Sequence, residues 1–201
     1  DMHTAGQSAD AALSTNMHYI EDPAIRAETM RIAAAFGAPY NAVFWGVDEG
    51  ATFTSSVERQ GKISIGTEIG GWGRVNPEGV RIGERGILNV MKACGVLEGK
   101  PDTTQRNGAK ATRQMMVKDP ANFLFAHATA TYEPMHLAGS NVKKGELAGL
   151  LHFIEDIDRD PIEIRYATSG VLWMGPGPGR VQRGDCVGVV MQDYDAAVAD
   201  N

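Results

Sequence analysis

A carboxylate at the end of an apolar segment is the clearest chemical feature of this chain. Glu68 follows the β-rich run 61–67 and precedes Gly70, Gly71 and Gly73. An unpaired carboxylate is costly at the tip of a buried strand, and carboxylates kept in such places often act as general bases. The glycines leave room for backbone or substrate to approach. The sequence therefore predicts a general base at Glu68, and an ordinary exposed glutamate that ends a strand is the alternative.

A second candidate for chemistry is His3, near the start of the chain. In any extended segment Asp1 and His3 point to the same side, because side chains alternate along a strand. A histidine at a strand end is a common zinc ligand, and a neighbouring acceptor holds its ring. A surface histidine is the alternative. No two histidines lie four residues apart, and the other four are expected to be structural or surface residues: His18, His127, His136 and His152.

The elements that must position these residues can be predicted for the first half of the chain. Residues 22–37 form a predicted helix that begins with an Asp-Pro pair and ends at a glycine. A short strand is expected at 41–45, a loop at 47–60, and the strand that carries Glu68 at 61–68. Apolar residues at helix-like intervals predict a second helix over roughly 79–94. This alternation indicates an α/β layer.

The second half of the chain has a different pattern. A polar linker is expected at 100–110, between an α/β part at 1–99 and a β module at 111–201. The module resembles the small β-sandwich of lipoyl domains, but the turn at 168–170 lacks the lysine that would carry a cofactor. A carrier role is therefore disfavoured. The expected strands are 111–117, 123–132, 149–153, 162–167, 170–174 and 187–191.

Composition limits the classes of function. The chain has 201 residues, a hydrophobic content of 43% that suits a globular core, and a net charge of −6 that disfavours nucleic-acid binding. No apolar run has the length of a membrane span. Cys94 and Cys186 have no metal-type spacing, and we expect buried, reduced thiols in a cytoplasmic protein.

Several motifs together resemble one enzyme family. The segments 1–6, 67–75 and 77–86, with 161–165 and 181–185 in the second half, are similar to the succinylglutamate desuccinylase/aspartoacylase family. The resemblance extends over nearly the whole chain. It implies part of a carboxypeptidase-like three-layer α/β/α domain, followed by the small all-β module. It also implies a zinc-dependent hydrolase that cleaves the amide bond of an N-acyl amino acid or a similar small molecule.

The resemblance also implies roles for individual residues. His3, within an Asp-x-His motif, would be a zinc ligand, and Glu68 would take a proton from zinc-bound water. A substrate carboxylate favours an arginine fork, and Arg59 and Arg74, which flank the Glu68 strand, are the candidates. An exposed arginine is the alternative for each. The acyl group, the amino-acid part and the oligomeric state stay open, and a homo-oligomer is compatible with the resemblance.

This sequence departs from the family pattern in one respect. The other two zinc ligands of the family come from a Gly-x-His-Gly-x-Glu motif that is absent here, as is an upstream Asn-Arg pair that grips substrate. The chain also begins without an initiator methionine. We therefore expect the C-terminal part of a longer enzyme. The alternative is a metal-free binding or regulatory protein that retains the hydrolase fold.

Overall fold

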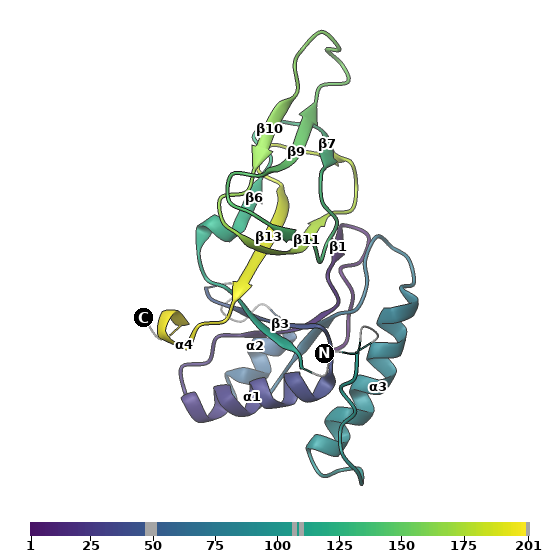
Figure 1. Cartoon of the computed structure of the whole chain (residues 1–201), viewed down its shortest axis with the longest axis vertical. Coiled ribbons are helices and arrows are strands. Elements are labelled where there is room, and N and C mark those ends of the chain that lie inside the picture. The colour runs from purple at the N-terminus through teal and green to yellow at the C-terminus, as the bar shows by residue number, and fades with distance from the viewer. Residues whose placement is uncertain (47–51, 106–107, 109–110, 200–201) are drawn as a thin grey trace.

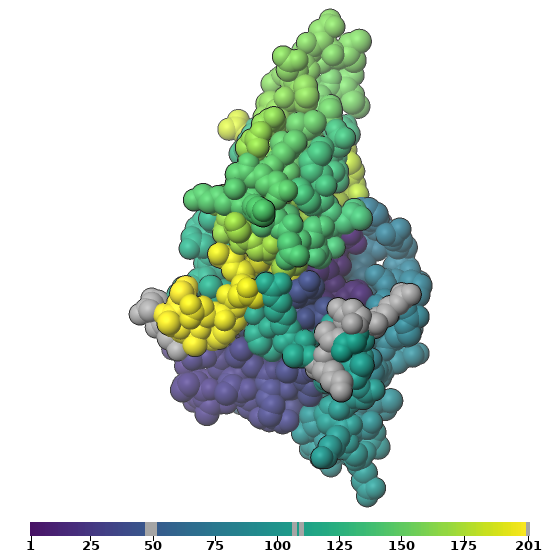
Figure 2. Space-filling model, viewed as in Figure 1, coloured from purple at the N-terminus to yellow at the C-terminus, as the bar shows by residue number. Residues whose placement is uncertain are grey.

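The structure is a computed structural model that describes residues 1–46, 52–105, 108 and 111–199. Figure 1 shows helices α1, α2 and α3 in the lower part of the molecule, and strands β7, β9 and β10 at its narrow upper end. The space-filling view shows the same broad lower body and tapering upper end (Figure 2).

The first half of the chain alternates strands and helices. Its elements are β1 (Ala9–Ala11), β2 (Ser14–His18), α1 (Pro23–Phe36), β3 (Tyr40–Phe44), α2 (Phe53–Glu58), β4 (Gly66–Glu68) and α3 (Pro77–Ala93).

The second half consists mainly of strands. Its elements are β5 (Arg113–Val117), the 3₁₀ turn η1 (Pro120–Asn122), β6 (Phe123–Phe125), β7 (Ala130–Pro134), β8 (Asn141–Val142), β9 (Leu147–His152), β10 (Ile162–Arg165), β11 (Gly170–Pro176), β12 (Arg180–Val181), β13 (Cys186–Asp193) and α4 (Ala196–Ala199).

Two sheets organise these strands. The larger has the order β1-β11-β13-β5-β3-β2-β4, with β6 on β13 and β8 on β11; the smaller has the order β10-β9-β7-β12. Strands β2, β3 and β5 run parallel. Strand β4 lies antiparallel to β2, so that Glu68 is opposite Ser14. The end of β4 that carries Glu68 is therefore at the beginning of β2.

Both long helices that the sequence predicted are present, and α1 begins and ends as expected. The Asp22 carboxylate accepts the backbone N–H of Ala24 at 2.8 Å, and Gly37 closes α1 with a left-handed φ of 84°. Helix α3 begins at Pro77, two residues before the expected start, because the Asn76 side chain caps it.

The expected loop at 47–60 is wrong over residues 53–58, which form helix α2. The Thr52 side chain accepts the N–H of Ser55 and caps this helix. Residues 47–51 lie outside the described residues. The strand expected over 61–68 is confirmed only over 66–68, and β1 and β2 were not predicted.

The overall architecture is mixed α/β. Strands dominate the second half as expected, but β5 pairs in parallel with β3, and β13 continues alongside β5. Residues from both halves therefore share one sheet. The separate lipoyl-like module and its boundary at residue 111 remain predictions.

The buried core has a part in each half. Around the upper sheet it includes Tyr132, Leu151 and Val190, and between α1 and α3 it includes Phe36 and Ile82. The prediction of buried thiols is wrong: Cys94 and Cys186 are both free and exposed. Within the described residues, no helix combines the length and the apolar character needed to cross a bilayer.

Candidate functional site

The start of the chain lies along the edge of β4 that β2 leaves open. The Asp1 ammonium donates to the Ile65 carbonyl at 2.9 Å, and the Ala5 N–H donates to the Gly70 carbonyl at 3.0 Å. Between them, the Ile69 N–H reaches the His3 carbonyl at 3.4 Å. Residues 1–5 thus run in the same direction as β4 and place His3 beside the end of that strand.

The structure brings the two predicted site residues together. His3 Nε2 lies 3.1 Å from Glu68 Oε1, and His3 Nδ1 lies 3.5 Å from Asp1 Oδ2. The His3 side chain is 41% exposed, whereas that of Glu68 is 8% exposed. One face of the imidazole is therefore open, while the carboxylate beside it is held in the protein.

A single hydroxyl fixes the backbone of His3. Thr67 Oγ1 accepts the His3 N–H at 3.0 Å and donates to the His3 carbonyl oxygen at 3.0 Å. Thr67 is buried, and its own backbone pairs with Thr15 of β2. Because the hydroxyl bonds the peptide groups on both sides of the His3 Cα, it restricts where the imidazole can lie relative to Glu68.

The carboxylate of Glu68 is only partly satisfied. Its Oε1 contacts His3, but its buried Oε2 has no hydrogen-bond partner among the described residues. Such an atom is costly to bury. The site therefore contains one unpaired carboxylate oxygen next to the oxygen that contacts His3.

Glycines allow α3 to approach the end of β4. A Cβ on Gly79 would lie 1.9 Å from the Ile69 carbonyl oxygen, so this position excludes any side chain. In the following turn, Trp72 has a φ of 57°, which a non-glycine residue rarely adopts. Of the predicted glycines, Gly71 lies closest to backbone, because a Cβ there would be 2.4 Å from the Ala9 carbonyl oxygen.

The two candidate arginines lie in different places. The Arg74 guanidinium stacks on the Trp72 ring, 4.8 Å from its centroid, in the turn that follows Glu68. Arg74 also acts on Asp10, whose carboxyl pKa is raised by burial and partly lowered by this guanidinium.

Arg59 is an exposed residue at the end of α2. The preceding residue, Glu58, contacts His18 at 2.7 Å. This contact is at the opposite end of β2 from the Ser14–Glu68 pair. Arg74 therefore lies in the turn that follows Glu68, whereas the backbone at Arg59 is at the other end of β2.

The described residues do not complete a metal centre. No group of three histidine, cysteine, aspartate or glutamate side chains in the described part of the chain could hold a metal ion. His3 supplies one imidazole, with Asp1 and Glu68 as carboxylates on either side. The sequence reasoning missed Thr67, since no local pattern shows that its hydroxyl meets a residue so distant in the chain.

Comparison with known proteins places these features in one family. Residues 1–94 match the succinylglutamate desuccinylase/aspartoacylase catalytic domain. The chain is 30% identical over 195 residues to N-alpha-acetyl-L-2,4-diaminobutyric acid deacetylase of Halomonas elongata, covering 96% of this chain and 55% of that protein.

Solved structures of related proteins have a similar fold. A succinylglutamate desuccinylase/aspartoacylase from Rhodobacter sphaeroides is 58% identical with a TM-score of 0.93, covering 97% of this chain and 58% of the other. The product-bound ectoine utilization protein EutE (DoeB) from Ruegeria pomeroyi is 28% identical with a TM-score of 0.86, covering 96% and 57%. The chain thus spans a little over half the length of these relatives.

Proposed function

Because this chain is similar to members of the succinylglutamate desuccinylase/aspartoacylase family, we propose that it forms part of a hydrolase of N-acyl amino acids or similar small molecules. The observation that carries the proposal is the contact between His3 and the buried Glu68, at 3.1 Å. The Halomonas elongata relative is named as a deacetylase of an N-acetylated amino acid, which agrees with this class of substrate.

In the proposed reaction Glu68 is the general acid and base. A buried carboxylate with a free oxygen can take a proton from the water that attacks the amide carbonyl. The same carboxylate can then return the proton to the leaving amine. Thr67 would hold His3, and His3 would hold Glu68 Oε1, which leaves Oε2 as the oxygen that takes the proton once the complete site admits the reacting molecule.

Zinc is the cofactor that we propose for the complete enzyme. Bound zinc lowers the pKa of its water to about 7 and polarises a carbonyl group. The described residues do not fit such a centre on their own, because they offer His3 but no group of three ligands. The proposal assigns His3 as one ligand and requires the others from outside the described residues.

Substrate recognition is proposed for the arginines. Arg74 lies in the turn after Glu68, where its guanidinium could pair with the carboxylate of an N-acyl amino acid. Arg59 is the second candidate, and it would need to reach across the sheet from the end of α2. The net charge of −6 disfavours nucleic acid as a partner. A cytoplasmic location and a homo-oligomeric state remain predictions.

A second function is a metal-free binding or regulatory protein with the hydrolase fold. The observation in its favour is that the described residues contain no complete ligand group. Such a protein would bind an N-acyl amino acid without turning it over. Metal content separates the two proposals, since only the first requires zinc near one atom per chain.

The decisive experiment is Glu68→Gln in the full-length protein. Loss of a general base should lower kcat by about a hundredfold to ten-thousandfold, while the zinc content stays that of the unmodified protein. Glu58→Gln is the matched control, because Glu58 is also a carboxylate that contacts a histidine and has one buried oxygen without a partner among the described residues. Unchanged turnover in Glu68→Gln would sink the assignment of the base. An unmodified protein that binds substrate without zinc or turnover would favour the second function.

A further inference from the structure

The upper sheet has one face that does not pack on the core. Tyr132 of β7 and Leu151 of β9 are buried between the sheet and the rest of the second half. Because side chains alternate along a strand, their neighbours Thr131 and His152 point to the opposite face. This face is at the end of the molecule away from α1 and α3 (Figure 1).

The strand register brings three polar side chains into one row on that face. Thr131 of β7 is opposite His152 of β9 and also opposite Arg180 of β12. Side chains paired directly across strands have Cβ atoms about 5 Å apart. His152 is held in this row by Glu133, with Nε2 to Oε2 at 2.7 Å. The positions of these groups are therefore fixed by the sheet.

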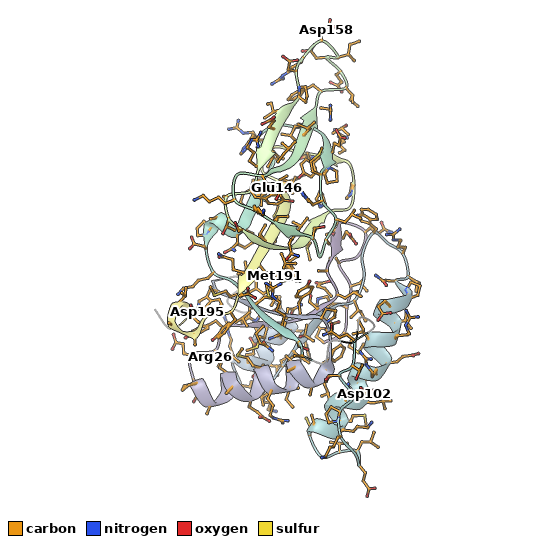
Figure 3. All side chains as sticks on the ribbon, in the orientation of Figure 1. Arg26, Asp102, Glu146, Asp158, Met191 and Asp195 are labelled. Atoms are coloured by element: carbon orange, nitrogen blue, oxygen red, sulfur yellow. The ribbon has the colours of Figure 1, made fainter. Side chains whose placement is uncertain are left out.

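The loop after β9 lines an open cavity next to this row, together with residues of β7, β9 and β12. Its turns are closed by the Asp156 N–H on the Phe153 carbonyl at 3.0 Å and by the Arg159 N–H on the Asp156 carbonyl at 3.1 Å. The Arg159 guanidinium stacks on the Phe153 ring, 3.5 Å from its centroid. Figure 3 shows Asp158 at the far tip of this loop. The volume of this cavity is about 490 Å³, within the usual range for small-molecule sites.

The walls of the cavity carry opposite charges. Arg159 and Arg180 supply two guanidinium groups, and Glu155 and Asp156 supply two carboxylates. In the described part of the chain, none of these four side chains has an ion-pair partner. A simple anion would meet the acidic wall and a simple cation the basic one. A small molecule with both charges can satisfy both.

We propose that this cavity binds a free amino acid in its zwitterionic form. Its carboxylate pairs with Arg180 and Arg159, and its ammonium group pairs with Glu155 and Asp156. The Phe153 ring and the aliphatic part of the neighbouring residues receive the side chain. The site shares no residue with the His3–Glu68 contact, so the proposal does not depend on the proposed hydrolase activity.

The test is a titration of the full chain with L-alanine, propionate and ethylamine, followed by NMR of the backbone amides. L-alanine should shift the amides of Thr131, His152 and Phe153. It should bind at least about tenfold more tightly than either singly charged molecule, since each lacks one charge-assisted contact. Equal binding of propionate and L-alanine would reduce the cavity to an anion site. No shift at these amides would overturn the proposal altogether.

Two variants test separately the basic and the acidic side chains of the cavity. Arg180→Gln should weaken L-alanine about tenfold, whereas Arg165→Gln should not, because Arg165 pairs with Glu163 on β10 outside the cavity. Glu155→Gln, on the exposed loop, should weaken L-alanine but leave propionate unchanged. If Arg180→Gln does not fold, Glu155→Gln alone decides, and an unchanged affinity for L-alanine in that variant contradicts the proposal.

Discussion

The hydroxyl of Thr67 should determine how firmly His3 is held beside Glu68. Valine has nearly the shape of threonine, so Thr67→Val removes the hydroxyl without opening a cavity. The variant loses the bond from the His3 N–H and the bond to the His3 carbonyl, both 3.0 Å long. Thr67→Ser keeps the hydroxyl and should keep both bonds.

The size of the effect follows from these two bonds. A hydrogen bond contributes about 1 kcal/mol net, so local opening at His3 should become easier by about 2 kcal/mol. This corresponds to about 30-fold faster exchange of the His3 amide hydrogen with solvent. Since the His3 ring then has more freedom, the contact between His3 Nε2 and Glu68 Oε1 should be populated for less of the time.

Amide hydrogen exchange measured by NMR is the assay, because it reports the His3 backbone directly. Thr15→Val is the matched control: Thr15 is buried opposite Thr67 in β2, and its hydroxyl donates to the Asn41 side chain at 2.9 Å, not to His3. Exchange at His3 should be fast only in Thr67→Val. A change of less than about threefold in that variant, or an equal change in Thr15→Val, would refute the clamp.

Two further predictions concern the framework of the site. Gly79→Ala should destabilise the fold by about 1–3 kcal/mol or more, because its Cβ would lie 1.9 Å from the Ile69 carbonyl oxygen. Gly83→Ala on the same helix is the control and should be far milder, because its Cβ would meet only flexible side-chain ends at 3.1 Å. Equal urea midpoints for the two variants would contradict this prediction. The Arg113 guanidinium lowers the pKa of the Asp193 carboxyl, so this pair between β5 and β13 stabilises the fold above pH 3.8 and loses its effect as the pH falls through the lowered pKa. Asp193→Asn should therefore cost about 0.2–1 kcal/mol at pH 7 and almost nothing at pH 2, as measured by urea unfolding.

Elements with strong local signals could be predicted from the sequence. Helix α1 has an aspartate cap, a proline in its first turn and a closing glycine, and each acts as expected. Most strands of the second half were found because apolar and polar residues alternate there. The single strand expected at 123–132 was wrong, since it forms β6 and β7 in different sheets, and β8 and β12 were not predicted. These signals depend on neighbours in the chain, so they do not require knowledge of the tertiary fold.

Strand β2 lacked such a signal. Its residues Ser14, Thr15 and Asn16 are polar, yet Ser14 and Thr15 are buried within the sheet. The Ser14 hydroxyl donates locally to the Ala12 carbonyl and accepts from a distant residue, the Trp173 indole, at 2.8 Å. Helix α2 was missed because its six residues are too few to show a helical period.

The candidate site itself depends on contacts that no local pattern contains. His3 and Glu68 are 65 residues apart, and the sequence linked them only through resemblance to a family. What the structure adds is the register that makes the contact possible. Gly66 is opposite Asn16, where a Cβ would lie 2.3 Å from the Asn16 side-chain oxygen.

A side chain at residue 66 would displace the Asn16 amide from its place, so glycine at this position favours the observed pairing of β4 with β2. A slip of this pairing by one residue would move Thr67 and Glu68 to opposite faces. Thr67 would then lose the backbone of His3, and the Glu68 carboxylate would leave the imidazole. The glycine at 66, two residues before the carboxylate, therefore contributes to the site as directly as the glycines that follow it.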